Sequence, residues 1–282
     1  MRPLLKQSQL YCHLKWVLAC IALLLSATTL AGNRIALVIG NAAYSEMPLD
    51  NPVNDALSMK SVLEKTGFEV VIATDASLVQ MQNALLDFTA RLNSQSTALV
   101  FYAGHGVQAN GKNYLLPVDA ELENQSQLKF QSLELTDMLE ELDASDARIK
   151  LVILDACRNN PFERSLRGSG RGLAAVDAAR GSLIAYATSP GATASDGDGD
   201  NGLYTSELLK AIEAPGLKVE EVFKQVRIQV SEKSRGQQVP WESSSLTGDV
   251  IFTGPRSNAQ FSTQTATQTA SQAAPTRPDN SA

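Results

Sequence analysis

One histidine and one cysteine stand out, because the chain has no other residue of either type after position 31. His105 lies between glycines in residues 102–106 (YAGHG), and Cys157 lies in residues 155–158 (DACR). A free thiol has a pKa of about 8.5, so only a small fraction of it is thiolate at neutral pH. A neighbouring imidazole raises that fraction and can later protonate a leaving amine. Together the two side chains would form a nucleophile and its general acid–base partner.

The surrounding elements predict where these two residues lie. Apolar runs typical of strands in a parallel sheet occupy residues 34–40, 69–74, 98–103, 149–154, 182–188 and 250–252. Helices are predicted from Asn51-Pro52 to Gly67, after a Ser77/Gln80 capping box, around 135–142, and over 203–213 and 218–233. Asn110-Gly111 predicts the turn of a β-hairpin that runs through residues 114–116. The alternation of strands and helices predicts a doubly wound α/β domain with right-handed crossovers.

The carboxyl ends of neighbouring parallel strands are where functional groups collect in such a sheet. His105 follows the third predicted strand and Cys157 follows the fourth. We therefore expect the imidazole and the thiol to lie within a few ångströms of each other, with the amide of Gly106 beside that of Cys157 as an oxyanion hole. The alternative is a small buried cysteine and an unrelated turn histidine, but their equivalent positions at two strand ends favour the catalytic pair.

The segments that carry this pair also resemble a known family. Residues 102–106 and 155–158 place a histidine and a cysteine about 50 residues apart, each after an apolar strand. Further matching segments are residues 49–56 (LDNPVNDA), 114–117 (YLLP) and 238–241 (QVPW). Over residues 34–252 the chain resembles the caspase-like cysteine peptidases, including the metacaspases and their bacterial relatives.

The resemblance implies a caspase–haemoglobinase fold, which is a six-stranded, mostly parallel sheet with helices on both faces. It also implies cleavage of peptide bonds after a defined side chain. In metacaspases that side chain is arginine or lysine, held by acids at the positions that Asp55 and Asp155 occupy here. We therefore expect a basic specificity, because paired carboxylates match a guanidinium and repel an acid. The alternatives are a helix-dipole partner for Asp55 and a loop-bonding acid for Asp155.

Two polar loops carry smaller hypotheses. The loop after Cys157 contains Arg167 and Arg171, after which self-cleavage is an alternative to a simple solvated loop. Residues 196–202 (DGDGDNG), with Glu207 at the twelfth position, resemble a calcium-binding loop, although Asn201 replaces the usual glycine. The alternative without a metal is a polar turn beside the substrate groove. We therefore expect no cofactor, with calcium at this loop as the one exception under consideration. One cysteine and one histidine do not suffice for a structural zinc site.

The first 31 residues are typical of a secretory signal peptide, with basic residues, a short apolar run and small residues before Ala31. We predict cleavage after Ala31 and export, with the periplasm as the expected compartment. An uncleaved membrane anchor is the main alternative, and lipid modification of Cys20 is a weaker one. Residues 32–253 are the predicted catalytic domain, and residues 254–282, rich in Ser, Thr, Gln and Ala, are predicted to be disordered.

Composition removes several classes of protein. With 44% hydrophobic and 19% charged residues, the chain is neither a disordered protein nor a long coiled coil. The net charge of −6 disfavours nucleic acid as a partner. The expected partner is a protein or peptide substrate, with membrane contact only through an uncleaved signal and the oligomeric state left open. Two other functions remain: a catalytically silent caspase-like domain that binds peptides or proteins, and a cysteine hydrolase that acts on a non-peptide amide.

Overall fold

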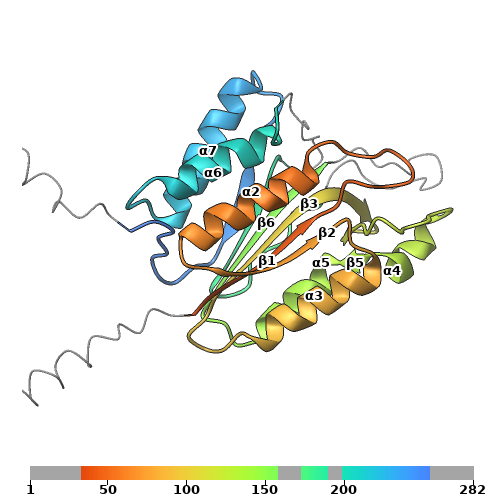
Figure 1. Ribbon diagram of the computed structural model, residues 1–282, viewed down its shortest axis with the longest axis horizontal. Coiled ribbons are helices and arrows are strands. Elements are labelled where there is room, and N and C mark those ends of the chain that lie inside the picture. The colour runs from red at the N-terminus through yellow and green to blue at the C-terminus, as the bar shows by residue number, and fades with distance from the viewer. Residues whose placement is uncertain (1–32, 158–172, 190–198, 255–282) are drawn as a thin grey trace, which may run out of the picture.

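The computed structural model describes residues 33–157, 173–189 and 199–254, shown in Figure 1. The predicted signal peptide, most of the predicted tail and the hypothetical cleavage sites at Arg167 and Arg171 lie outside these residues. Within the described ranges, none of the helices combines the length and the apolar character needed to cross a lipid bilayer.

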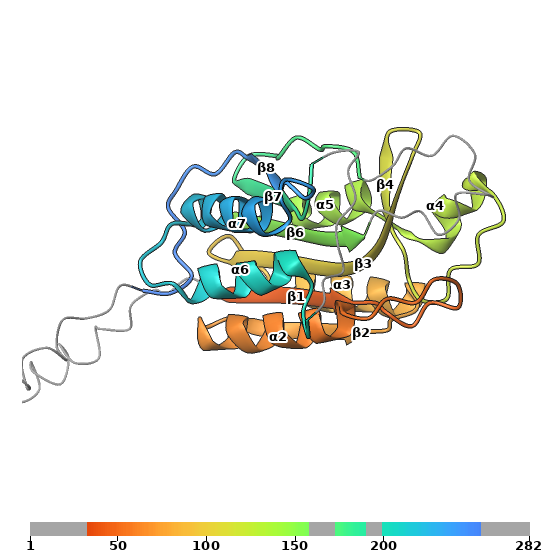
Figure 2. The same cartoon turned by 90° about the horizontal axis from the view of Figure 1, so that it is seen from above.

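A central sheet runs in the order β2-β1-β3-β6-β7-β8, and the strands lie side by side in Figure 2. The first five strands in this order are parallel and β8 is antiparallel, which confirms the predicted six-stranded, mostly parallel arrangement. The strands are β1 (Arg34–Gly40), β2 (Glu69–Thr74), β3 (Thr97–Ala109), β6 (Ile149–Cys157), β7 (Ser182–Tyr186) and β8 (Trp241–Ser244). Two short strands, β4 (Lys112–Leu115) and β5 (Leu133–Glu134), continue from β3 outside this path.

Helices cover both faces of the sheet, as predicted (Figure 1). One face carries α2 (Pro52–Lys65), α6 (Leu203–Glu213) and α7 (Val219–Lys233), and the other carries α3 (Leu78–Ala90) and α5 (Leu135–Ala144). Because side chains alternate along a strand, Phe101 of β3 packs on the first face and Tyr102 on the second. The short helices η1 (Gln125–Gln127) and α4 (Leu128–Gln131) precede β5.

The helix boundaries follow from local sequence signals. Pro52 begins α2. Proline suits this position because an amide in the first turn has no hydrogen-bond acceptor within the helix. Helix α3 begins with the predicted capping box of Ser77 and Gln80. The hairpin between β3 and β4 turns at Asn110 and Gly111, whose φ angles are 51° and 78°. Both positive angles are those that a tight two-residue hairpin turn requires.

The prediction for the last strand was wrong. Residues 250–252 make one isolated bridge, Lys218 to Ile251, and the strand that closes the sheet is β8, paired antiparallel with β7. The apolar run at 250–252 instead reflects packing, because Val250 and Phe252 are buried in the core. In the same way β7 ends at Tyr186 rather than at the predicted Thr188.

Candidate active site

His105 and Cys157 lie directly opposite each other on neighbouring parallel strands. The ladder between β3 and β6 runs from Thr97 paired with Ile149 to His105 paired with Cys157. Adjacent strands are about 4.8 Å apart, so the two backbones are as close as the fold permits. Both residues were predicted to follow their strands, whereas each lies within one. β3 continues because its far end pairs with β4, which extends the strand through the glycine-rich segment around His105.

One ring nitrogen of His105 has a defined partner. Nε2 lies 2.8 Å from the carbonyl oxygen of Met47, in the loop between β1 and α2. A carbonyl oxygen only accepts hydrogen bonds, so Nε2 donates and carries the proton in the neutral ring. Nδ1 is then the basic nitrogen, and it is the one able to take a proton from a thiol.

The glycines on either side of His105 are required for different reasons. Gly104 has φ of 153°, and a Cβ built there would lie 2.7 Å from the hydroxyl oxygen of Tyr44 and 2.8 Å from that of Tyr102. A Cβ at Gly106 would lie 3.0 Å from the Cβ of Ala156, the residue before Cys157. Side chains at either position would therefore disturb His105 or separate the two strands.

Asp155 is held at the end of β6 by a helix that begins about 50 residues later in the chain. Its side chain is buried, and its Oδ2 accepts a hydrogen bond of 2.7 Å from Oγ1 of Thr205, in the first turn of α6. Tyr204, the residue before Thr205, is fully buried. This burial, and to a smaller extent the negative charge of Asp155, raises the pKa of Tyr204 well above its usual range. This end of the sheet is therefore a poorly solvated, electronegative environment.

Asp55 reaches the same helix from the first turn of α2. Its Oδ1 accepts hydrogen bonds of 2.9 Å from Nδ2 of Asn201 and 3.0 Å from the amide of Gly202, which caps α6. The structure thus brings the carboxylates of Asp55 and Asp155 to one feature, the start of α6, although they are about 100 positions apart. Sequence reasoning identified both acids but missed Asn201 and Thr205 as their partners.

Two residues beside His105 were also missed. Met47 supplies only a backbone carbonyl, which no side-chain pattern signals, but its φ of 55° is unusual for a residue other than glycine. The ring of Tyr44 lies 4.4 Å from the imidazole, centroid to centroid. Tyr44 lies four residues after the end of β1, in the loop at the carboxyl end of that strand. Loops at the carboxyl ends of parallel strands converge, so this position in the sequence could have identified Tyr44 as a candidate site residue.

The calcium hypothesis falls partly outside the described residues, since residues 196–198 are not among them. Asn201 directs its side chain to Asp55, and Glu207 is buried in α6. Oε1 of Glu207 lies 2.7 Å from Nζ of Lys210 and 2.6 Å from Nζ of Lys233. The carboxylate expected to bind calcium is therefore engaged by two ammonium groups, and calcium binding stays a prediction.

Comparison with known proteins places the whole described domain in one family. The model of the caspase domain family matches residues 33–251. The mucosa-associated lymphoid tissue lymphoma translocation protein 1 of Homo sapiens is 30% identical over 167 residues, which are 58% of this chain and 19% of that protein. The paracaspase of Dictyostelium discoideum is 30% identical over 133 residues, which are 45% of this chain and 31% of that protein. The chain thus spans less than a third of these relatives, and over residues 33–251 it belongs to the caspase domain family of cysteine peptidases.

Proposed function

We propose that the protein is a cysteine endopeptidase that uses Cys157 as nucleophile and His105 as general acid and base. The observation that carries this proposal is the pairing of His105 with Cys157 where the parallel ladder between β3 and β6 ends. The hydrogen bond from Nε2 to Met47 supports it, because this bond leaves Nδ1 as the basic nitrogen. Proteins are the substrates implied by the caspase domain.

The reaction follows from these roles. Nδ1 of His105 takes the thiol proton, and the thiolate of Cys157 attacks the carbonyl carbon of the scissile peptide bond. The oxyanion that forms would be stabilised by the amides of Gly106 and Cys157. The imidazolium then protonates the leaving amine, which departs and leaves a thioester. Water activated by His105 hydrolyses this thioester and restores the thiol.

We further propose cleavage after arginine or lysine, with Asp55 and Asp155 binding the basic side chain. Both carboxylates are buried, and both lie at the start of α6. A guanidinium carries five N–H donors in a plane and can bind two carboxylates at once, whereas an acidic side chain would add a third negative charge. In this structure the bonds from Asn201 and Thr205 hold the two acids in position.

The test is turnover of matched fluorogenic peptides that end in arginine, lysine or aspartate before the reporter, using the full chain. We expect turnover of the basic peptides alone, and a loss of at least about 1,000-fold in Cys157→Ala and His105→Ala. Asp55→Asn and Asp155→Asn should raise KM for the basic peptides, while Asp249→Asn, an exposed partner of Lys218, should change nothing. Equal turnover of the aspartate peptide would contradict the specificity, and full activity of Cys157→Ala would contradict the mechanism.

The competing function is a silent caspase-like domain that binds peptides. It would show as saturable binding of the arginine peptide without turnover, and the same measurement repeated with added calcium tests the calcium hypothesis. A calorimetric titration of the protein with calcium chloride, without heat of binding, would reject the calcium site independently of activity.

A further inference from the structure

Two buried tyrosines hold the backbone of His105 from both sides. The hydroxyl of Tyr44 accepts a hydrogen bond of 3.0 Å from the amide of His105, and the hydroxyl of Tyr102 donates one of 2.7 Å to its carbonyl oxygen. Tyr44 is 7% exposed and Tyr102 is fully buried. The peptide groups of most strand residues bond to the neighbouring strand, so two side-chain hydroxyls on one residue are an unusual arrangement.

The proton positions in this cluster can be assigned from its chemistry. The carbonyl oxygen of Leu116 lies 3.0 Å from each tyrosine hydroxyl and 3.1 Å from Nδ2 of Asn41. A carbonyl oxygen has two lone pairs and each hydroxyl has one proton. Because Tyr102 directs its proton to the nearer oxygen, that of His105, Leu116 accepts from Asn41 and Tyr44. The amide of Leu116 donates to the second lone pair of the His105 carbonyl oxygen at 3.0 Å, and the two tyrosine hydroxyls lie 3.3 Å apart.

Tyr44 also contacts the reactive ring. Its ring centroid lies 4.4 Å from that of the imidazole, with an angle of 49° between the planes. This geometry lies between stacked and edge-to-face packing and restricts the rotation of the imidazole. Tyr44 therefore fixes His105 twice, through the backbone amide and through the ring, while Tyr102 fixes the carbonyl.

We propose that Tyr44 and Tyr102 are positioning residues that keep Nδ1 of His105 directed at Cys157. The inference rests on the proposed function, because it requires His105 to act on the thiol. Neither tyrosine touches the substrate in this scheme. Gly104 belongs to the same arrangement, because only a residue without Cβ leaves room for both hydroxyls.

The test compares Tyr44→Phe and Tyr102→Phe with Tyr114→Phe in the full chain. Tyr114 packs in the same apolar cluster as Tyr44 and lies on β4, so its variant controls for the loss of a tyrosine hydroxyl from this cluster. We expect kcat on the arginine peptide to fall about 10- to 100-fold in the first two variants, with KM within about twofold of wild type. Tyr44→Leu, which also removes the ring, should fall further than Tyr44→Phe.

A second readout does not need peptide cleavage. The rate at which iodoacetamide alkylates Cys157, followed by mass spectrometry of its peptide, reports the thiolate fraction. We expect this rate to fall several-fold in Tyr44→Phe and Tyr102→Phe and to stay unchanged in Tyr114→Phe. Thermal unfolding of all variants separates these effects from lost stability.

The outcomes are distinguishable. Unchanged kcat and alkylation rates in Tyr44→Phe and Tyr102→Phe would overturn the positioning role while leaving the catalytic pair intact. A wild-type alkylation rate equal to that of His105→Ala would contradict the pair itself, and with it the positioning role. A rise in KM with unchanged kcat in both Tyr44→Phe and Tyr102→Phe would assign the tyrosines to substrate binding and would also overturn the inference.

Discussion

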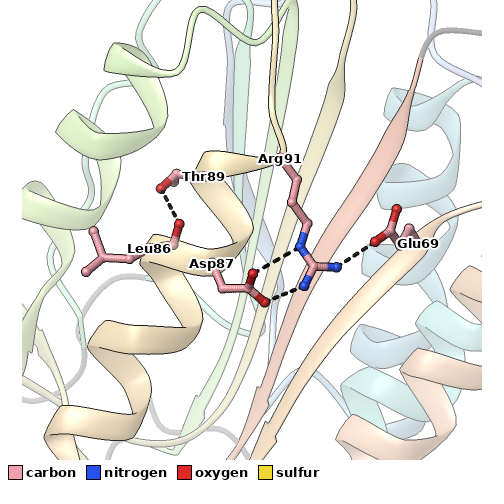
Figure 3. Close-up of polar contacts among 5 residues, drawn as sticks. All are labelled: Glu69, Leu86, Asp87, Thr89 and Arg91. Carbon is pink, nitrogen blue, oxygen red and sulfur yellow. Dashed lines mark hydrogen bonds and ion pairs between the residues drawn. The ribbon is translucent and has the colours of Figure 1, made fainter.

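The carboxyl ends and the amino ends of the parallel strands carry polar side chains of two different kinds. At the carboxyl ends His105, Asp55 and Asp155 are buried, and the hydrogen-bond partners described above come from distant segments. At the amino ends Lys150 is buried and Arg34 is half-buried, but a cluster of charged side chains there is exposed. Figure 3 shows one such cluster, in which Arg91 at the end of α3 contacts Asp87 and Glu69.

The difference shows where the fold depends on exact placement. A buried polar group is costly unless it is hydrogen-bonded, so each polar residue at the carboxyl ends constrains the segment that satisfies it. An exposed ion pair loses little when it is broken, because water replaces the partner. We therefore expect substitutions at the two ends to separate activity from stability.

The largest effect is expected from Gly104→Ala at the carboxyl end. The new Cβ would collide with the hydroxyls of Tyr44 and Tyr102, and the backbone angle of 153° is unfavourable for alanine. We expect a loss of about 2 to 4 kcal/mol in the free energy of unfolding, measured in urea, and a fall of more than about 100-fold in kcat. Gly111→Ala is the control, because its φ of 78° is also positive but nothing lies within 4 Å of the new atom. Equal losses in both variants would show that the collision does not matter.

Arg34→Met at the amino end should separate stability from activity. The guanidinium of Arg34 donates to the carbonyl oxygens of Thr66, Ile251 and Phe252, at 2.8 to 3.0 Å, and so ties the last described segment to the sheet. Methionine fills similar space and leaves three carbonyls without this donor, which should cost about 2 to 3 kcal/mol. Turnover per folded molecule should not change, as checked by active-site titration. Arg34→Lys should recover part of the lost free energy of unfolding. A fall in the kcat of Arg34→Met would contradict the expected difference between the two ends of the sheet.

A smaller effect, dependent on pH, is expected from Glu207→Gln between α6 and α7. Burial acts to raise the pKa of Glu207, but the hydrogen bonds from Lys210 and Lys233 outweigh it, so the pKa lies below the usual 4.5. A lowered carboxyl pKa gives stability that is present above 4.5 and lost as pH falls through the lower value. The difference from wild type, about 1 to 2 kcal/mol near pH 7, should shrink below pH 4.5 in urea titrations. Glu213→Gln, in an exposed pair with Lys65, should show almost no difference at any pH.

The smallest effect is expected from Arg91→Ala in the cluster of Figure 3. The hydrogen bonds that Arg91 donates to Asp87 and then to Glu69 raise the pKa of Arg91, but the three side chains are all well exposed. We expect a change in Tm close to the resolution of the measurement, which disappears in about 1 M salt because screening removes such interactions. A large loss that persists in high salt would mean that the amino end is more rigid than its exposure indicates.

Local sequence signals predicted most of the fold, because those signals act over short distances. The bounds of β1, β2 and α6 match the expected ranges, and the capping box at Ser77 and the hairpin turn at Asn110 have the predicted geometry. The strand at 250–252 was wrong because an apolar run shows that residues are buried, not that they hydrogen-bond to a strand.

The site was predictable only in part. Two unusual side chains at equivalent strand ends identified His105 and Cys157, and their pairing in register is found in the structure. The donors that satisfy the buried acids were not predictable, since Thr205 and Asn201 are common residues made important by a contact with a segment far away in sequence. The carbonyl of Met47 carries no side-chain signal at all.

The pairing of β3 with β6 also limits where this chain can change in length. The same number of residues separates Thr97 from His105 as separates Ile149 from Cys157, and the ladder between them is unbroken. A single-residue insertion or deletion within one strand would shift His105 relative to Cys157 and reverse the faces of the residues beyond it. The number of residues between His105 and Cys157 can therefore change in the connection that includes α5, but the two strand segments that precede them must keep equal length. A change in the length of one of these strands therefore has to be matched in the other if His105 is to stay opposite Cys157.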